Sequence, residues 1–261
     1  MPSSMRFLHA LRRRTLQLGC AVLALSCEAV AAAEPLPVYM LEAPPLTMSG
    51  PPGENGILGD AALLAGALAD QPLALQSLPW NRAQRMVQQG QDLLIIPLSR
   101  TPERESKYTW IAPVMTMERA FFSLSKQVGS FAEARQTYQR IAVGMGSAQE
   151  QKLREEGFSD EQIYPLKIGE NPAQMLLLGR VDAWFNGVPE TQYIWKGVSS
   201  KPLLMSPPLM SADLYLACSA QCSEARVHSL RQAVETLRRN GTLNRLIHHY
   251  LYGLPSDSSV P

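Results

Sequence analysis

The sequence has few of the residues that mark several common classes of protein. It holds only four cysteines and four histidines in 261 residues. We recognise no Ser-His-Asp or Cys-His arrangement that would indicate nucleophilic catalysis. The formal net charge of +1 leaves no basic surface of the kind that binds nucleic acid. We therefore expect no metal ion, no cofactor and no nucleic-acid partner.

Apolar runs long enough to cross a membrane are also missing. The longest run, 16–30, is short for a bilayer and is interrupted by Ser26-Cys27-Glu28. Basic residues precede it at 6 and 12–14, and the small residues Ala31-Ala32-Ala33 follow it. This order is typical of a cleaved export signal. We predict that 1–33 is a signal peptide, cut after about Ala33, and that the mature protein is periplasmic.

Three other interpretations of the leader stay open. The first is that the apolar run is a short membrane anchor, although it is too short for a regular span. Cys20 or Cys27 would carry a lipid in a lipoprotein, but neither follows the Leu that a lipobox requires. Arg13-Arg14 resembles the start of a twin-arginine signal. In each case about 228 residues with a net charge of about −2 remain beyond Ala33.

Beyond the leader only Cys218 and Cys222 remain. Their spacing suits either a local disulfide or half of a metal site. The nearest histidine is His228, and no further cysteine is present to complete a metal site. Because exported proteins meet oxidising conditions, we expect a disulfide between Cys218 and Cys222.

Strand-like and helix-like segments alternate in the first part of the mature chain. Short apolar runs suggest strands, and apolar residues three and four apart suggest helices. Asp60 is the expected N-cap of the first helix, and Gly90 the expected end of the second. The predicted elements are a strand at 37–41, a helix at 60–69, a strand at 73–78, a helix from Pro79 to Gly90 and a strand at 93–96.

A similar unit follows Pro113. The Asn171-Pro172 pair is typical of a helix start, because Asn caps helices and Pro suits the first helical position. The alternation predicts an α/β fold. The predicted elements are strands at 121–125, 141–145, 162–166, 181–186 and 205–216, and helices at 147–156, 171–178, 224–239 and 242–250.

Several short motifs appear in an order that is familiar from one family. They are Gly56-Ile57-Leu58-Gly59-Asp60, Pro79-Trp80 with Gly90-Gln91-Asp92, Ser99-Arg100-Thr101-Pro102-Glu103-Arg104, Trp110-Ile111-Ala112-Pro113, Gly146-Ser147-Ala148-Gln149-Glu150, Gly179-Arg180-Val181-Asp182-Ala183, and the final helix that ends at Tyr250. The chain resembles the family 3 extracellular solute-binding proteins, the periplasmic receptors of polar amino-acid ABC transporters.

The resemblance covers nearly the whole mature chain and implies a type II periplasmic-binding-protein fold. Such a fold has two α/β lobes joined by two crossing strands, with the ligand in the cleft between them. We expect lobe one to comprise 34–114 plus 210–261, and lobe two to comprise 115–209. The implied partners are a small carboxylate-bearing ligand, such as an amino acid, and an ABC transporter permease. We expect a monomer.

The resemblance also implies ligand-binding residues after the strand at 93–96. Arg104 matches the family's arginine that forks onto the ligand carboxylate, and a guanidinium suits this task because its donors are planar. Ser99 and Thr101 would add hydroxyl groups. The alternative for Arg104 is an ion pair with a glutamate of the same loop.

On lobe two, Gly146 and Ser147 match the family's second anion-binding turn. They precede a helix, whose free N–H groups and dipole would face the ligand. The alternative for Ser147 is simply the N-cap of that helix.

Two departures from the family pattern concern the ligand itself. The family's ammonium-binding Asp is replaced by Gly187, and the neighbouring Asn186 offers only a neutral hydrogen bond. The aromatic residue of the first loop is missing from Ala43-Pro44-Pro45-Leu46. Glu42 is the candidate on that loop to replace the missing carboxylate. Tyr39, Trp80 and Trp184 are further candidates, although core packing is the alternative for both tryptophans.

Other functions on the same scaffold stay open. A few relatives are dehydratases, and such chemistry would need a poised carboxylate or histidine in the cleft. Only Glu42 and Glu190 suit that role, and the sequence shows no partner for either. A third alternative is an orphan sensor that signals without transport. We expect a binding protein and not an enzyme.

Overall fold

A computed structural model describes residues 34–166 and 170–253. The predicted signal peptide, 1–33, lies outside the described residues. None of the helices within the described ranges has both the length and the apolarity that a membrane crossing requires.

The described strands form one mixed sheet in the order β2-β1-β3-β9-β4-β7-β5-β6, with β8 paired to β4. β1, β2 and β3 are parallel to one another, as are β5, β6 and β7, whereas β4 and β9 run antiparallel to their neighbours. The strands are β1 (Leu36–Met40), β2 (Leu73–Ser77), β3 (Leu94–Ser99), β4 (Tyr108–Ser123), β5 (Ile141–Gly144), β6 (Ile163–Leu166), β7 (Ala183–Gly187), β8 (Leu204–Met205) and β9 (Met210–Ser219).

Helices occupy most of the connections between these strands, as the alternating pattern predicted. They are α1 (Gly56–Leu68), α2 (Trp80–Gln89), the short 3₁₀ helix η1 (Pro102–Lys107), α3 (Phe131–Thr137), α4 (Ala148–Glu155), α5 (Pro172–Leu177), α6 (Val188–Val198), α7 (Glu224–Arg239) and α8 (Thr242–Tyr252).

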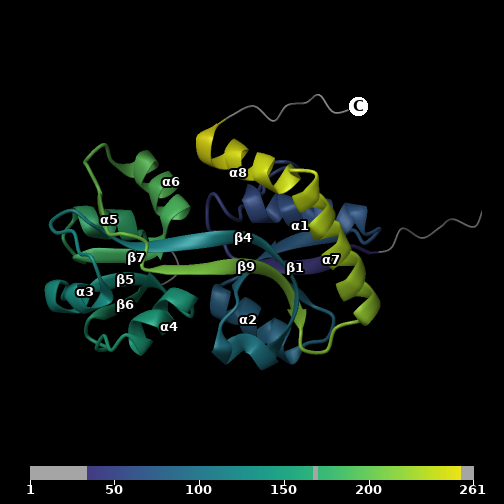
Figure 1. Cartoon of the computed structure of the whole chain (residues 1–261), viewed down its shortest axis with the longest axis horizontal. Coiled ribbons are helices and arrows are strands. Elements are labelled where there is room, and N and C mark those ends of the chain that lie inside the picture. The colour runs from purple at the N-terminus through teal and green to yellow at the C-terminus, as the bar shows by residue number, and fades with distance from the viewer. Residues whose placement is uncertain (1–33, 167–169, 254–261) are drawn as a thin grey trace, which may run out of the picture. The chain divides into compact units, whose positions relative to one another are not determined.

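The long strands β4 and β9 connect two groups of elements. They pair from Tyr108↔Ser219 to Arg119↔Met210, with two register shifts on the way. Figure 1 shows them crossing between α1, α2, α7 and α8 on one side and α3 to α6 on the other. The crossing strands therefore carry the chain from one lobe into the other.

Each lobe has its own hydrophobic core, divided by the sheet. In lobe one, α1, α7 and α8 cover one face around Leu58, Ile96 and Leu230, and α2 covers the other around Val87 and Ile95. In lobe two, one cluster surrounds Phe121 and Phe185, while the other contains Trp184 and Trp195. Each of the two groups of elements therefore packs around apolar clusters of its own.

Several boundaries differ from the predicted ones. The helix predicted at 60–69 begins at Gly56, so the expected N-cap role of Asp60 is wrong. Asp60 instead accepts a hydrogen bond of 3.0 Å from Asn55 Nδ2 and another from the hydroxyl of Tyr250. Its carboxylate thus joins the start of α1 to α8, a long-range contact that local sequence does not reveal.

Two α-helices and the short 3₁₀ helix η1 were missed, and one strand is longer than predicted. α3 begins at Ser130, whose hydroxyl accepts the N–H of Glu133, and α6 follows Gly187 with Pro189 in its first turn. Both starts carry ordinary capping residues but few apolar residues in a regular pattern. β4 is continuous from Tyr108 to Ser123, whereas we predicted a strand only from 121.

In the structure Cys218 and Cys222 are joined by a disulfide, with their Cα atoms 6.1 Å apart. The bridge lies at the end of β9, just before α7. Beside it Asp92 accepts the backbone N–H of Ser223 at 2.7 Å and pairs with Arg226. Because both sulfur atoms are consumed by the disulfide, this cluster offers no thiolate to a metal ion.

Candidate functional site

The end of β3 and the start of η1 bring three of the predicted site residues together. Ser99 is the last residue of β3, Thr101 is the N-cap of η1, and Arg104 lies within η1. Arg104 is only 6% exposed although its neighbours Glu103 and Glu105 are exposed. The short helix therefore turns one cation of a charged loop inwards.

Arg104 contacts both lobes. Its Nη1 donates to the carbonyl oxygen of Ser99 at 3.2 Å, and its Nη2 donates to the carbonyl oxygen of Gly146 at 3.0 Å. Among the described residues, no carboxylate lies within ion-pair distance of its guanidinium. The glutamates of the loop are paired elsewhere, Glu103 with Lys107 and Glu105 with Arg100.

The turn at Gly146 is fixed mainly by its own helix. Ser147 is the N-cap of α4 and accepts the N–H of Glu150 at 3.2 Å, while Glu150 Oε2 accepts the N–H of Gly146 at 2.6 Å. The pair resembles a capping box, except that Glu150 accepts the N–H of Gly146, one residue before the N-cap, and not that of Ser147 itself. The N–H of Gly146 is therefore occupied by Glu150 in this structure, and the group that faces lobe one is the carbonyl of Gly146.

Helix α2 of lobe one approaches the same turn. Gln84 Nε2 donates to the carbonyl oxygen of Gly146 at 3.2 Å, and the side chain of Asn81 fills the space where a Cβ at Gly146 would lie. Gly146 has φ +71°, a conformation that favours glycine. A groove of about 440 Å³ is lined here from both lobes by Asn81, Gln84, Arg104, Gly146, Ser147, Glu150 and neighbouring polar residues.

A second buried arginine, Arg119, was missed by the sequence analysis. It lies on the crossing strand β4 and is 2% exposed. Its Nη2 donates to Ser99 Oγ at 2.8 Å and its Nη1 to the carbonyl oxygen of Met117 at 3.1 Å, but Nε has no partner. In the sequence, polar Thr116 and Glu118 alternate with apolar Met115 and Met117, and this alternation would have placed Arg119 on the apolar face of the strand.

Glu190, on the first turn of α6, lies on the same face of the sheet as Arg119. Gly187 is directly opposite Arg119 in the β4–β7 register. A Cβ at Gly187 would collide with Glu190 Oε2 and would lie 2.8 Å from Met117 Sδ. The missing side chain at 187 thus leaves room for the Glu190 carboxyl beside the strand that carries Arg119.

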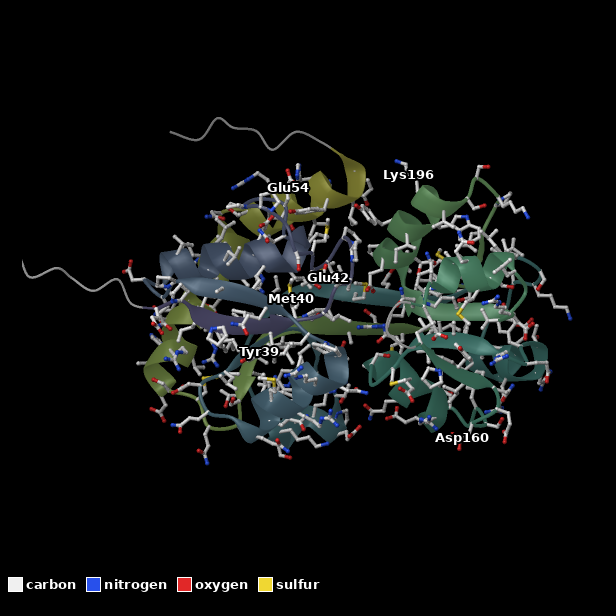
Figure 2. The ribbon with its side chains drawn as sticks, turned by 180° about the vertical axis from the view of Figure 1, so that it is seen from behind. Tyr39, Met40, Glu42, Glu54, Asp160 and Lys196 are labelled. Atoms are coloured by element: carbon white, nitrogen blue, oxygen red, sulfur yellow. A yellow bond between two sulfur atoms is a disulfide. The ribbon has the colours of Figure 1, made fainter. Side chains whose placement is uncertain are left out.

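We call Ser99, Thr101, Arg104, Arg119 and Glu190 the cluster. The remaining predicted residues lie outside it. Asn186 pairs with Ala120, one position from Gly187, and therefore has the opposite orientation; its Nδ2 contacts Thr191 Oγ1 at 3.3 Å. Glu42 accepts hydrogen bonds from the backbone and hydroxyl of Ser49. Figure 2 shows it beyond Tyr39 and Met40, at the end of β1.

Burial governs the electrostatics of the cluster. Desolvation lowers the pKa of Arg104 and lowers that of Arg119 to about 10. Desolvation also raises the pKa of Glu190 to about 7, against the attraction of Arg119. Thr101 Oγ1 is buried without a hydrogen-bond partner. The site therefore combines two poorly solvated cations, one carboxyl and an unpartnered hydroxyl.

Comparisons with known proteins place this geometry in a known fold. No protein-family model and no curated protein matches the sequence. Solved structures do match. A histidine kinase sensor domain with similarity to periplasmic binding proteins aligns with a TM-score of 0.73 and 14% identity, covering 84% of this chain and 96% of that one.

Two further matches are binding proteins. An ancestral arginine-binding protein bound to glutamine gives a TM-score of 0.71 at 16% identity, covering 84% of this chain and 98% of that one. EhuB in complex with hydroxyectoine gives 0.71 at 19% identity, covering 82% and 87%. The chain therefore has the two-lobe periplasmic-binding-protein fold that the sequence predicted, with β4 and β9 as the crossing strands.

Proposed function

We propose that this protein is an exported solute-binding protein that captures a small carboxylate-bearing solute, most simply an amino acid, between its lobes. The observation that carries the proposal is Arg104, a buried guanidinium between the lobes that has no carboxylate partner among the described residues. A ligand carboxylate would supply that partner bidentately. Thr101 Oγ1 and Ser99 Oγ would add hydrogen bonds to the same anion.

The Gly146 turn supports a closing motion around such a ligand. Its carbonyl already accepts hydrogen bonds from Gln84 and Arg104 of lobe one. We place the lobe boundaries at 114/115 and 209/210, so the crossing strands would act as the hinge. A ligand that contacts both lobes would favour the closed arrangement by its extra affinity for that state.

The proposal extends to the protein's setting. The mature protein is periplasmic and monomeric, acts without a cofactor, and delivers its ligand to an ABC transporter permease. Binding without catalysis is favoured over dehydratase-like chemistry, because Arg119 attracts the buried carboxyl of Glu190 and no histidine or second carboxyl of the described residues acts on its pKa. The sensor alternative keeps the same ligand site, and one of the matched structures is a kinase sensor domain.

Substituting Arg104 tests the proposed site directly. Purified wild-type protein is titrated by isothermal calorimetry with the common amino acids and with succinate and glutarate. Arg104→Ala is expected to weaken the tightest-binding member by about thirtyfold, the effect of losing a charge-assisted hydrogen-bonded pair. Arg100→Ala is the matched control, because Arg100 is exposed and paired with Glu105 on the same loop. Equal affinity of Arg104→Ala and wild type would refute the assignment.

Substituting Gly146 tests closure. Gly146→Ala forces the Asn81 side chain out of its place and puts a Cβ at φ +71°, so binding of the same ligand is expected to weaken about tenfold. Gly179→Ala is the control, since Gly179 has φ +62° but nothing within 4 Å of its Cβ position. A similar loss in both variants would mean that backbone strain alone, and not contact between the lobes, causes the effect.

A further inference from the structure

The buried charge of the cluster restricts what kind of carboxylate ligand fits it. Arg119 is 2% exposed, and a guanidinium has five N–H donors. Two of its nitrogen atoms are satisfied by Ser99 Oγ and the Met117 carbonyl, whereas Nε is buried without a partner. No carboxylate of the described residues lies within ion-pair distance of it.

Arg104 and Arg119 act on the same region. Both bind Ser99, one through its carbonyl oxygen and the other through its hydroxyl. The positive charges of Arg104 and Arg119 repel each other. Desolvation is the main cause of the lowered pKa of Arg119, and repulsion by Arg104 lowers it further. Two adjacent cations removed from water are costly unless anionic groups neutralise them.

Two carboxyls act on this pair: Glu103, which is itself neutralised by Lys107, acts on Arg104, and Glu190 acts on Arg119. Glu190 attracts Arg119 without forming an ion pair, and it occupies the space that Gly187 leaves empty. Ionised Glu190 leaves the three groups with a net charge of about +1. A single ligand that neutralises this charge carries one more negative than positive charge.

We propose that the ligand is a dicarboxylic α-amino acid, with one carboxylate at Arg104, the second at Arg119 and the ammonium group at Glu190. This inference rests on the proposed function, since it specifies the ligand class of the same cleft. A neutral amino acid would leave one buried guanidinium without a counter-charge. A dicarboxylate without an amine would face the Glu190 carboxylate with no cation between them.

The test compares acids with their amides. Calorimetric titration of wild-type protein is expected to give at least about thirtyfold tighter binding of L-glutamate or L-aspartate than of L-glutamine or L-asparagine. Arg119→Met, which keeps a long apolar side chain, should abolish this preference, and Arg119→Lys should restore part of it. Far-ultraviolet circular dichroism confirms that each variant is folded.

A second variant tests the ammonium position. Glu190→Gln should weaken L-glutamate binding about tenfold while leaving glutarate binding unchanged or improved, because only L-glutamate presents an ammonium group.

The possible outcomes separate the two proposals. If an amide or a basic amino acid binds more tightly than the acids, or if Arg119→Met keeps the preference for acids, the dicarboxylic assignment is overturned while a solute-binding function stands. If Glu190→Gln weakens glutarate as much as L-glutamate, the ammonium position is overturned. If no member of the panel binds at millimolar concentration, both proposals fail.

Discussion

Glu190→Gln is expected to stabilise the ligand-free protein at pH 8 by about 2–3 kcal/mol and to leave its stability nearly unchanged at pH 4.5. Burial raises the pKa of Glu190 in the folded protein to about 7, above the ordinary glutamate value of 4.5. Between these two values the folded state holds a proton that the unfolded state has released. The free energy of unfolding therefore falls as pH rises through this window. Glutamine stays neutral and does not lose this stability.

Urea unfolding at pH 4.5, 6 and 8 measures the effect as a difference between variant and wild type, so that other titrating groups cancel. Glu103→Gln is the matched control, because Glu103 is an exposed carboxylate paired with Lys107. A difference between Glu190→Gln and wild type that does not change with pH would show that Glu190 titrates alike in both states. Repeating the series with saturating L-glutamate should reduce the difference at pH 8 by about 1.4 kcal/mol, because the tenfold weaker binding expected of Glu190→Gln lowers its stabilisation by the ligand by that amount.

The fold was predictable because its signals are local. Apolar runs such as Leu94–Ile96 become buried strands, and Asn171 and Ser147 cap helices with their own side chains. α3 and α6 were missed although Ser130 and Pro189 mark their starts, because neither helix has a regular apolar stripe. The disulfide was predictable from the separation of Cys218 and Cys222 and from the expected export.

The sequence predicted the site residues only where they lie close together along the chain. Ser99, Thr101 and Arg104 lie within one short segment after β3, so a motif can identify them together. Arg119 and Glu190 belong to the cluster through the β4–β7 register and through a helix that the sequence did not reveal. From the sequence alone, Gly187 indicates that a carboxylate is missing at this position. In the structure the carboxyl of Glu190, from the first turn of α6, occupies the space beside Gly187.

Arg119→Met is expected to raise the free energy of unfolding of the ligand-free protein by about 1–2 kcal/mol, and the melting temperature by about 2–6 °C. Desolvation lowers the pKa of Arg119 from 12.5 to about 10, which corresponds to roughly 3 kcal/mol against the charged form at neutral pH. The substitution also removes two hydrogen bonds, each contributing about 1 kcal/mol. The desolvation cost is the larger of the two, so methionine should be the more stable residue.

Arg154→Met controls for the loss of an arginine, since Arg154 is largely exposed and paired with Glu150 and Asp160. Differential scanning calorimetry without ligand gives the comparison. A lower melting temperature for Arg119→Met would mean that Arg119 is retained for the fold, and its unpartnered Nε would lose its significance. A higher melting temperature together with lost selectivity for acids would mean that methionine stabilises the fold but impairs ligand binding. Arginine would then be kept at position 119 for its role in binding and at a cost in stability.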